Sequence, residues 1–138
     1  MPNRKFPGRT ALYMEEILLA APFSATQAEI IAGKTIVVAR KPNQTLKPLG
    51  FRMEATGSFS TLTDIRISSD NDTPVDIATV TQSNISGRMS LDSGTVTVGA
   101  GMDANLGAGD GIQLRSTGSD MTGGGSLVGV VYFLVTSQ

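Results

Sequence analysis

The sequence predicts an all-β fold: an antiparallel β-sandwich of about eight strands, arranged as a jelly roll, with an N-terminal arm and a short helix. Three observations predict it. From Lys34 onward, apolar and polar residues alternate with the period of two that strands require. Clusters of Gly, Pro, Asn and Asp separate these runs roughly every 8–15 residues. The length of 138 residues also suffices to bury the core of one domain.

The N-terminal end is expected to be an extended basic arm over residues 1–10, followed by a single β-sandwich domain over residues 11–138. The arm contains two prolines, one glycine and three positive charges, and it shows no hydrophobic period. Apolar residues then recur at helical spacing up to Pro22, which predicts a short helix over residues 11–21. They are Ala11, Met14, Ile17, Leu18 and Ala21.

Residues 24–33 fit two kinds of structure. Ser24 and Gln27 have the spacing of a capping box, and Gly33 stands where a glycine often ends a helix. The alternation from Thr26 to Ile30 fits a strand equally well. Helix and strand therefore both stay open for this segment.

The alternating runs place the strands. They are expected at residues 36–39, 49–56, 64–68, 75–77, 89–91, 96–98, 112–115 and 127–135. Turn-forming residues lie between them, at 42–43, 47–48, 70–74, 92–94, 99–111 and 118–125. Strand spacing does not determine connectivity, so an immunoglobulin-like sandwich or another barrel remains open beside the jelly roll.

The last predicted strand is apolar on both faces. One face carries Val128, Val130, Tyr132 and Leu134, and the other carries Val131, Phe133 and Val135. A strand at the surface of a monomeric sandwich would have polar residues on one face. We therefore expect either another layer, such as the N-terminal helix, or another subunit to cover the second face; an exposed patch is the third possibility.

The composition excludes many kinds of active site. The chain has no His, Cys or Trp, so a zinc site with the usual ligands, a Cys or His nucleophile and a disulfide framework are all excluded. Charged residues make up only 17%, and they are unevenly divided. Residues 1–52 carry a net charge of +5 and residues 53–138 one of −6. We expect a non-enzymatic protein without catalytic residues or cofactors. Either the charges mix once the chain folds, or their division suits contact between copies or contact of the basic arm with an acidic partner.

Two motifs are candidate ligand sites. Gly33, Lys34 and Thr35 look like the end of a phosphate-binding loop, but the first glycine of that motif is missing and a strand follows. Asp70, Asp72 and Asp76 stand close enough in sequence to share a cation, although acidic residues are also common in turns. We expect no metal, and whether that loop holds a cation stays open.

Targeting and nucleic-acid signals are weak. Glu15 and Glu16 interrupt the only segment that could serve as a signal peptide, and no apolar run reaches the length of a membrane span. The arm supplies only three basic residues for nucleic acid. We therefore expect no contact with a membrane, nucleic acid or small-molecule substrate.

The C-terminal third resembles a known family. The stretch from Leu106 to Gly118, the glycine-rich loop through Gly125 and the strand from Leu127 to Val135 look like the closing strands of small β-sandwich proteins of tailed bacteriophages. These are the capsid decoration, or cement, proteins. The similarity covers about 35 residues closely and the strand rhythm from Lys34 loosely.

The resemblance implies a structural role in a virion. Proteins of this family commonly form homotrimers on the outer capsid surface, bridge neighbouring major capsid proteins and stabilise the shell. It implies synthesis in the host cytoplasm and a final location in the virion. The residues expected to clamp the capsid are Arg4, Lys5, Phe6 and Arg9, and those expected at a subunit or capsid interface are Val131, Phe133 and Val135.

Three alternatives share the same strand pattern. A tail- or fibre-associated phage module would be found with tails rather than heads. A jelly-roll coat protein of a small virus would assemble into shells by itself. A carbohydrate-binding module would need aromatic side chains to stack on sugars, and the chain has only five Phe and two Tyr.

Overall fold

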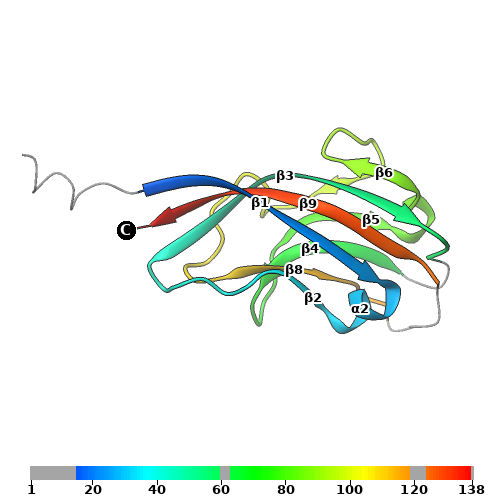
Figure 1. Cartoon of the computed structure of the whole chain (residues 1–138), viewed down its shortest axis with the longest axis horizontal. Helices are drawn as coiled ribbons and strands as arrows, with labels where there is room; N and C mark the ends of the chain where they lie inside the picture. The colour runs from blue at the N-terminus through cyan, green and yellow to red at the C-terminus, as the bar shows by residue number, and fades with distance from the viewer. Residues whose placement is uncertain (1–14, 60–62, 119–123, 138) are drawn as a thin grey trace, which may run out of the picture.

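The computed structural model describes residues 15–59, 63–118 and 124–137, and within these it is a sandwich of two antiparallel sheets (Figure 1). The predicted arm, residues 1–10, lies outside the described residues. The strands are β1 (Glu15–Thr26), β2 (Lys34–Val37), β3 (Gln44–Thr56), β4 (Asp64–Asp70), β5 (Asp76–Thr81), β6 (Gly87–Ser90), β7 (Thr97–Val98), β8 (Gly111–Arg115) and β9 (Ser126–Ser137). A helix, α2, spans Gln27–Ala32, and a 3-10 turn spans Gln82–Asn84. The predicted all-β sandwich is confirmed.

The strand order is that of a jelly roll. One sheet has the order β1-β9-β3-β6 and the other the order β2-β8-β4-β5-β7. Setting aside the two-residue β7, the first strand pairs with the last, the second with the second-last, and so on inward to β4 and β5. A long antiparallel hairpin that rolls up into two sheets produces this nesting, which is the topology of jelly rolls.

The core lies between the two sheets. Along β3 and β9, buried side chains that face inward alternate over most of the strand with more exposed side chains that face outward. Many of the inward side chains have almost no exposed surface; among the largest are Leu46, Ile65, Ile67, Ile77, Met89, Ile112, Leu114 and Leu127. The alternation of apolar and polar residues in the sequence therefore reflects the burial of one face of each sheet.

The N-terminal helix is predicted at the wrong place. Within residues 11–21, the described part from Glu15 onward is strand β1, which pairs with β9 along twelve residues. Residues such as Leu18 and Ala21 favour helices by propensity, but this pairing outweighs a preference of a few tenths of a kcal/mol per residue. Pro22 fits this position because β1 is an edge strand, where a missing N–H costs little.

The helix instead occupies the segment that the sequence left open. Thr26 is its N-cap, and Thr26 with Glu29 forms the capping box, rather than Ser24 with Gln27. The Glu29 N–H donates to Thr26 Oγ1 over 3.3 Å, and the Thr26 N–H donates to Glu29 Oε1 over 2.9 Å. Gly33 ends the helix at φ 90°, a conformation that favours glycine.

A turn was expected at residues 47–48, but these residues lie within β3. The proline is accommodated beside a register shift between Pro48 and Gly50. Along the part of β3 that leads up to Pro48, the long loop between β7 and β8 runs beside the strand. The N–H groups of Asp103, Leu106 and Gly109 donate hydrogen bonds to β3 carbonyls. The loop predicted at 99–111 is therefore present up to Asp110, and it covers the edge of β3 that β6 leaves unpaired.

Candidate functional site

The interface residues predicted on β9 lie in the core. Val131, Phe133 and Val135 are 0%, 3% and 3% exposed, on the inner face of the four-stranded sheet. These residues are therefore not available for an interface on the surface of the described chain, because the opposite face of β9 points outward. Both faces of the strand are apolar, so the sequence pattern alone could not distinguish inside from outside.

The outward surface of the four-stranded sheet is apolar over β1 and β9. Strand register places Leu18 beside Leu134, Ala20 beside Tyr132, and Pro22 beside Val130. We call this surface the apolar sheet face; it consists of Leu18, Ala20, Pro22, Val128, Val130, Tyr132 and Leu134. Leu18 is 63% exposed and Val128 52% exposed, so neither α2 nor any other described element covers them.

The first half of β1 is exposed on both of its faces. Ile17 and Leu19 point to the inner side, where they are in register with Val135 and Phe133, yet they are 54% and 41% exposed. Within the described residues, β1 pairs with β9 and with no other strand, so its second edge is open. We call Glu16, Ile17, Leu18 and Leu19 the β1 tip. An open edge with apolar side chains is a site where a further chain can pack.

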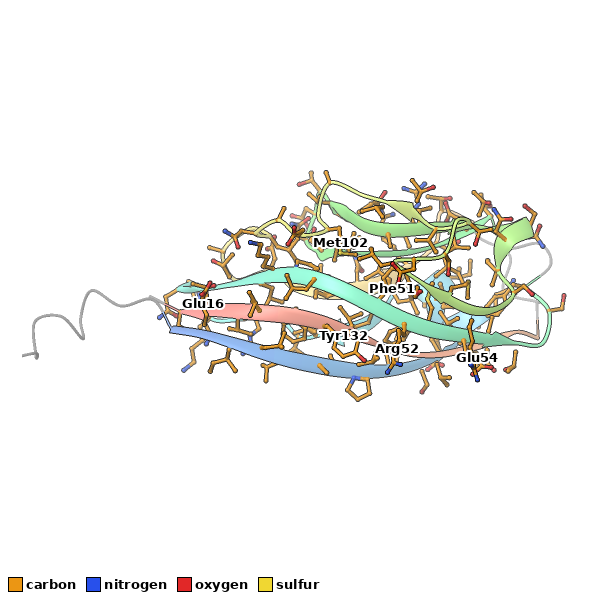
Figure 2. The ribbon with its side chains drawn as sticks, turned by 90° about the horizontal axis from the view of Figure 1, so that it is seen from above. Glu16, Phe51, Arg52, Glu54, Met102 and Tyr132 are labelled. Atoms are coloured by element: carbon orange, nitrogen blue, oxygen red, sulfur yellow. The ribbon has the colours of Figure 1, made fainter. Side chains whose placement is uncertain are left out.

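A groove crosses the other end of the same outer surface. Its volume is about 660 Å³, and it runs over β9, β3, β6 and the turn after β6. We call it the β9 groove; its outward side chains are Arg52, Glu54, Arg88, Ser90, Ser93, Val128 and Val130. Figure 2 shows Arg52 beside Tyr132, whose hydroxyl accepts a hydrogen bond from the Arg52 Nη2 over 3.0 Å.

The Arg52 guanidinium also lies 5.9 Å from the centre of the Tyr132 ring. This contact holds the arginine at the border between the apolar sheet face and the β9 groove. The groove thus combines apolar side chains on β9, Val128 and Val130, with charged side chains on β3 and β6. Such a surface suits an apolar segment that carries an acidic residue.

The outward surface of the five-stranded sheet is polar instead. Arg66 forms ion pairs with Asp64 over 2.9 Å and with Asp76 over 2.6 Å, and Arg115 pairs with Asp76 over 2.9 Å. The Nε of Arg115 also donates to Ser68 Oγ over 2.8 Å. These charged and polar groups pair with one another within the chain. This surface is therefore less suited to a protein contact than the apolar sheet face is.

Asp64 is the most buried acid of this cluster. Burial raises the pKa of its carboxyl, but hydrogen bonds outweigh that effect and leave the pKa below its ordinary value. The donors are the N–H of Thr117 at 2.9 Å, Nε of Arg66 at 2.9 Å and the hydroxyl of Thr117 at 3.0 Å. Asp64 therefore ties the loop after β8 to the start of β4.

The acidic residues weighed as a cation site do not converge. Asp76 lies in β5 and is engaged by Arg66 and Arg115, whereas Asp70 ends β4 and Asp72 lies in the turn after it. Over residues 15–59, 63–118 and 124–137, no group of three or more acidic residues could hold a metal ion. Lys34 and Thr35 begin β2, a strand, as expected after the incomplete phosphate-loop motif.

The predicted capsid clamp, Arg4, Lys5, Phe6 and Arg9, lies outside the described residues. Its position relative to β1 is known only from the sequence: it precedes Glu15. Among the helices that the structure describes, none is long and apolar enough to span a membrane.

Comparisons with known proteins give a similarity of fold alone. No protein-family model matches the chain, and no curated protein matches it. Among solved structures, a chain from the acidic stable capsid structure of Helicobacter pylori bacteriophage KHP30 is similar, with a TM-score of 0.48 and 9% sequence identity. The match covers 91% of this chain and 99% of that chain. At this level of similarity it carries no argument about the residues, partners or function of the present chain.

Proposed function

We propose that this protein is a non-enzymatic structural component of a virus particle: a capsid decoration protein that binds the outer shell as a homotrimer and stabilises it. Residues 11–138 would form its single domain, and the major capsid protein would be its partner. The observation that carries the proposal is the contrast between the two outer sheet surfaces. The outer surface of the four-stranded sheet is apolar over β1 and β9 and has an open strand edge, whereas that of the five-stranded sheet is polar and internally ion-paired.

The apolar sheet face and the adjoining β1 tip are expected to be covered by a partner. Large apolar side chains that are exposed singly are common on soluble proteins, and Val38, Val75 and Val98 are of that kind. Ile17, Leu18 and Leu19 are instead consecutive, and Leu18 continues into the apolar sheet face. A contiguous patch of this kind marks an interaction site. A protein whose work is contact between subunits needs such a surface and no reactive side chain.

Trimer formation would increase the avidity of the protein for the shell. A single interface of ordinary size buries ~1,600 Å² and can be modest in affinity. A trimer presents three such contacts at once, and linkage raises the overall avidity by a factor of ~10²–10⁴. Modest contacts would therefore hold neighbouring capsid proteins together.

The basic arm would make the contact with the shell. Arg4, Lys5 and Arg9 would pair with carboxylates of the major capsid protein, and Phe6 would add apolar contact. Arg4 precedes Glu15 by 11 residues, so an extended chain would place it at most about 40 Å from the start of β1. Three positive charges suit an acidic protein surface better than nucleic acid, which favours larger basic patches.

The test is binding to shells of the virus that encodes the protein. Purified protein is mixed with unexpanded and expanded heads, and bound protein is measured by co-sedimentation and located by cryo-electron microscopy. We expect binding to expanded heads at three-fold positions. The triple variant Arg4→Glu, Lys5→Glu, Arg9→Glu should bind at least tenfold more weakly, whereas Lys41→Glu, an exposed charge outside the arm, should bind normally. Failure of the wild-type protein to bind heads would contradict the proposal.

A second candidate is favoured by the strand topology alone. The nested order of β1-β9-β3-β6 and β2-β8-β4-β5 also occurs in shell-forming viral coat proteins. Such a protein would assemble into closed shells without any other protein, which electron microscopy of the purified chain would reveal. A tail- or fibre-associated module would bind tails in the same co-sedimentation experiment.

A further inference from the structure

We propose that copies of this chain associate head to tail: the β1 tip of one copy docks into the β9 groove of the next. This rests on the proposed function, because it names the contact that would build the trimer. The β1 tip comprises Glu16, Ile17, Leu18 and Leu19. The β9 groove is lined by Arg52, Glu54, Arg88, Val128 and Val130, among others.

The β1 tip is suited to insertion into a partner. Three consecutive apolar residues, Ile17, Leu18 and Leu19, are 54%, 63% and 41% exposed, and both faces of the strand take part. Burial of such side chains against a partner removes apolar surface from water, which favours association. A strand that is exposed on both faces and along one edge gains most from a partner that encloses it, and a groove does so better than a flat surface.

The β9 groove is complementary to the tip in polarity and charge. On β9 it carries Val128 and Val130, and Val128 is itself 52% exposed. On the adjacent strands β3 and β6 it carries Arg52 and Arg88 against one carboxylate, Glu54, so these three residues sum to +1. The tip carries Glu16, which is exposed and points to the same outer side as Leu18. An apolar strand with one acid would thus meet apolar side chains on β9 and a net positive charge on β3 and β6.

A chain cannot fill its own groove. In the register of β1 with β9, Leu18 pairs with Leu134 whereas Val128 pairs with Ser24, so the two sites are six residues, or about 20 Å, apart along the sheet. Figure 2 shows Glu16 and Glu54 at opposite ends of this layer. Two different patches that fit each other make a heterologous contact, which closes into a ring when its rotation allows. A three-membered ring agrees with the proposed homotrimer.

Pairing of two β1 edges is the competing arrangement, and Pro22 disfavours it. Proline lacks the N–H that a continued sheet would need, and prolines in edge strands typically keep that side unpaired. Pro22 lies in the middle of β1, in register with Val130. A strand added along the whole β1 edge would therefore lose its ladder at this point, whereas docking of residues 16–19 leaves Pro22 outside the contact.

Engineered disulfides provide the test, because the chain contains no cysteine. We expect Leu18→Cys combined with Val128→Cys to give covalent dimers and trimers on oxidation, resolved on a denaturing gel. The two positions are too far apart to join within one chain. The matched control, Leu18→Cys combined with Val98→Cys, replaces an exposed valine of similar accessibility in the other sheet and should stay monomeric.

Sedimentation velocity of the full chain provides the second measurement. Leu18→Lys should shift the trimer toward monomer by at least tenfold in dissociation constant, whereas Val98→Lys should leave it unchanged. Arg88→Glu should weaken the trimer, and Glu16→Arg added to it should restore part of the loss. Because Leu18 is exposed in the single chain, these variants should keep the wild-type fold, as measured by far-ultraviolet circular dichroism.

Several outcomes would overturn the inference. Covalent dimers from Leu18→Cys alone would indicate β1 edges paired with each other, and a ladder of bands beyond three would indicate an open filament rather than a ring. A monomeric wild-type chain would also overturn it, even if that chain still bound heads and so left the decoration role intact. A trimer that depends on Leu18 but ignores heads and tails would instead contradict the proposed function alone.

Discussion

At the scale of single residues, Asp64 links stability to pH. Its pKa in the folded protein is below the ordinary value, so its contribution to folding is fully present above the ordinary pKa of Asp, about 3.9, and is lost as the pH falls through the folded value. Asn at this position keeps the shape but accepts fewer hydrogen bonds and carries no charge for Arg66. The ion pair and the loop anchor should weaken together.

We expect Asp64→Asn to lower the free energy of unfolding at pH 7 by about 1–3 kcal/mol. The difference from the wild type should shrink steadily as the pH falls from 5 toward 2, because the wild-type carboxylate then becomes protonated. Urea unfolding at a series of pH values measures both effects. Asp92→Asn, in an exposed turn, is the control and should differ little from wild type. Equal stability of Asp64→Asn and wild type at pH 7 would refute this account.

Gly129 is a second residue whose role is steric. A Cβ there would lie 2.5 Å from the carbonyl oxygen of Arg52 and 2.7 Å from Cζ of Phe23. The Phe23 ring packs over this glycine from the neighbouring strand, in direct register with it. The absence of a side chain on β9 thus makes room for an aromatic ring on β1.

Gly129→Ala should therefore destabilise the fold by about 1–3 kcal/mol, since the ring and the β3 backbone must move apart. Gly50→Ala is the matched control in the same sheet, because a Cβ there meets no atom within 4 Å. Urea midpoints of the two variants compare them directly. A wild-type midpoint for Gly129→Ala would show that the sheet accommodates the methyl group.

At the scale of elements, the sequence period predicts strands well where one face is buried. β4 and β8 alternate cleanly because their outer faces are polar, and both are predicted within a few residues. β1 fails because it is exposed on both faces in its first half, so no alternation marks it, and its Leu and Ala residues favour a helix. The pairing with β9 that makes it a strand is a contact between opposite ends of the chain.

The apolar pattern of β9 predicts only part of the interaction surface. Two apolar faces on residues 127–135 indicate that something beyond an ordinary core contacts this strand. They do not indicate which face is inward, because Val131 and Val130 are equally apolar. The β9 groove could not be predicted at all, since its walls come from β3 and β6 and meet β9 only through the fold.

Helix α2 depends on its capping box more than on its length. At six residues it is far shorter than a helix that is stable alone. We expect Thr26→Ala to lower the free energy of unfolding by about 1 kcal/mol, because the helix loses the oxygen that accepts the Glu29 N–H. Thr26→Ser keeps that oxygen and should retain most of the stability. Equal urea midpoints for the Ala and Ser variants would show that the cap contributes nothing.

At the scale of the whole molecule, the two proposed contacts differ in physical character and can be separated by salt. Contact of the arm with the shell depends on the charges of Arg4, Lys5 and Arg9, which salt screens within about 3 Å at 1 M. Trimer contact depends chiefly on burial of Leu18 and its neighbours, which salt does not weaken. Raising NaCl from 0.1 to 1 M should therefore release the protein from heads while sedimentation still shows a trimer. If 1 M NaCl instead dissociated the trimer while the protein stayed on heads, the trimer contact would be the charged one and the contact with the shell the apolar one.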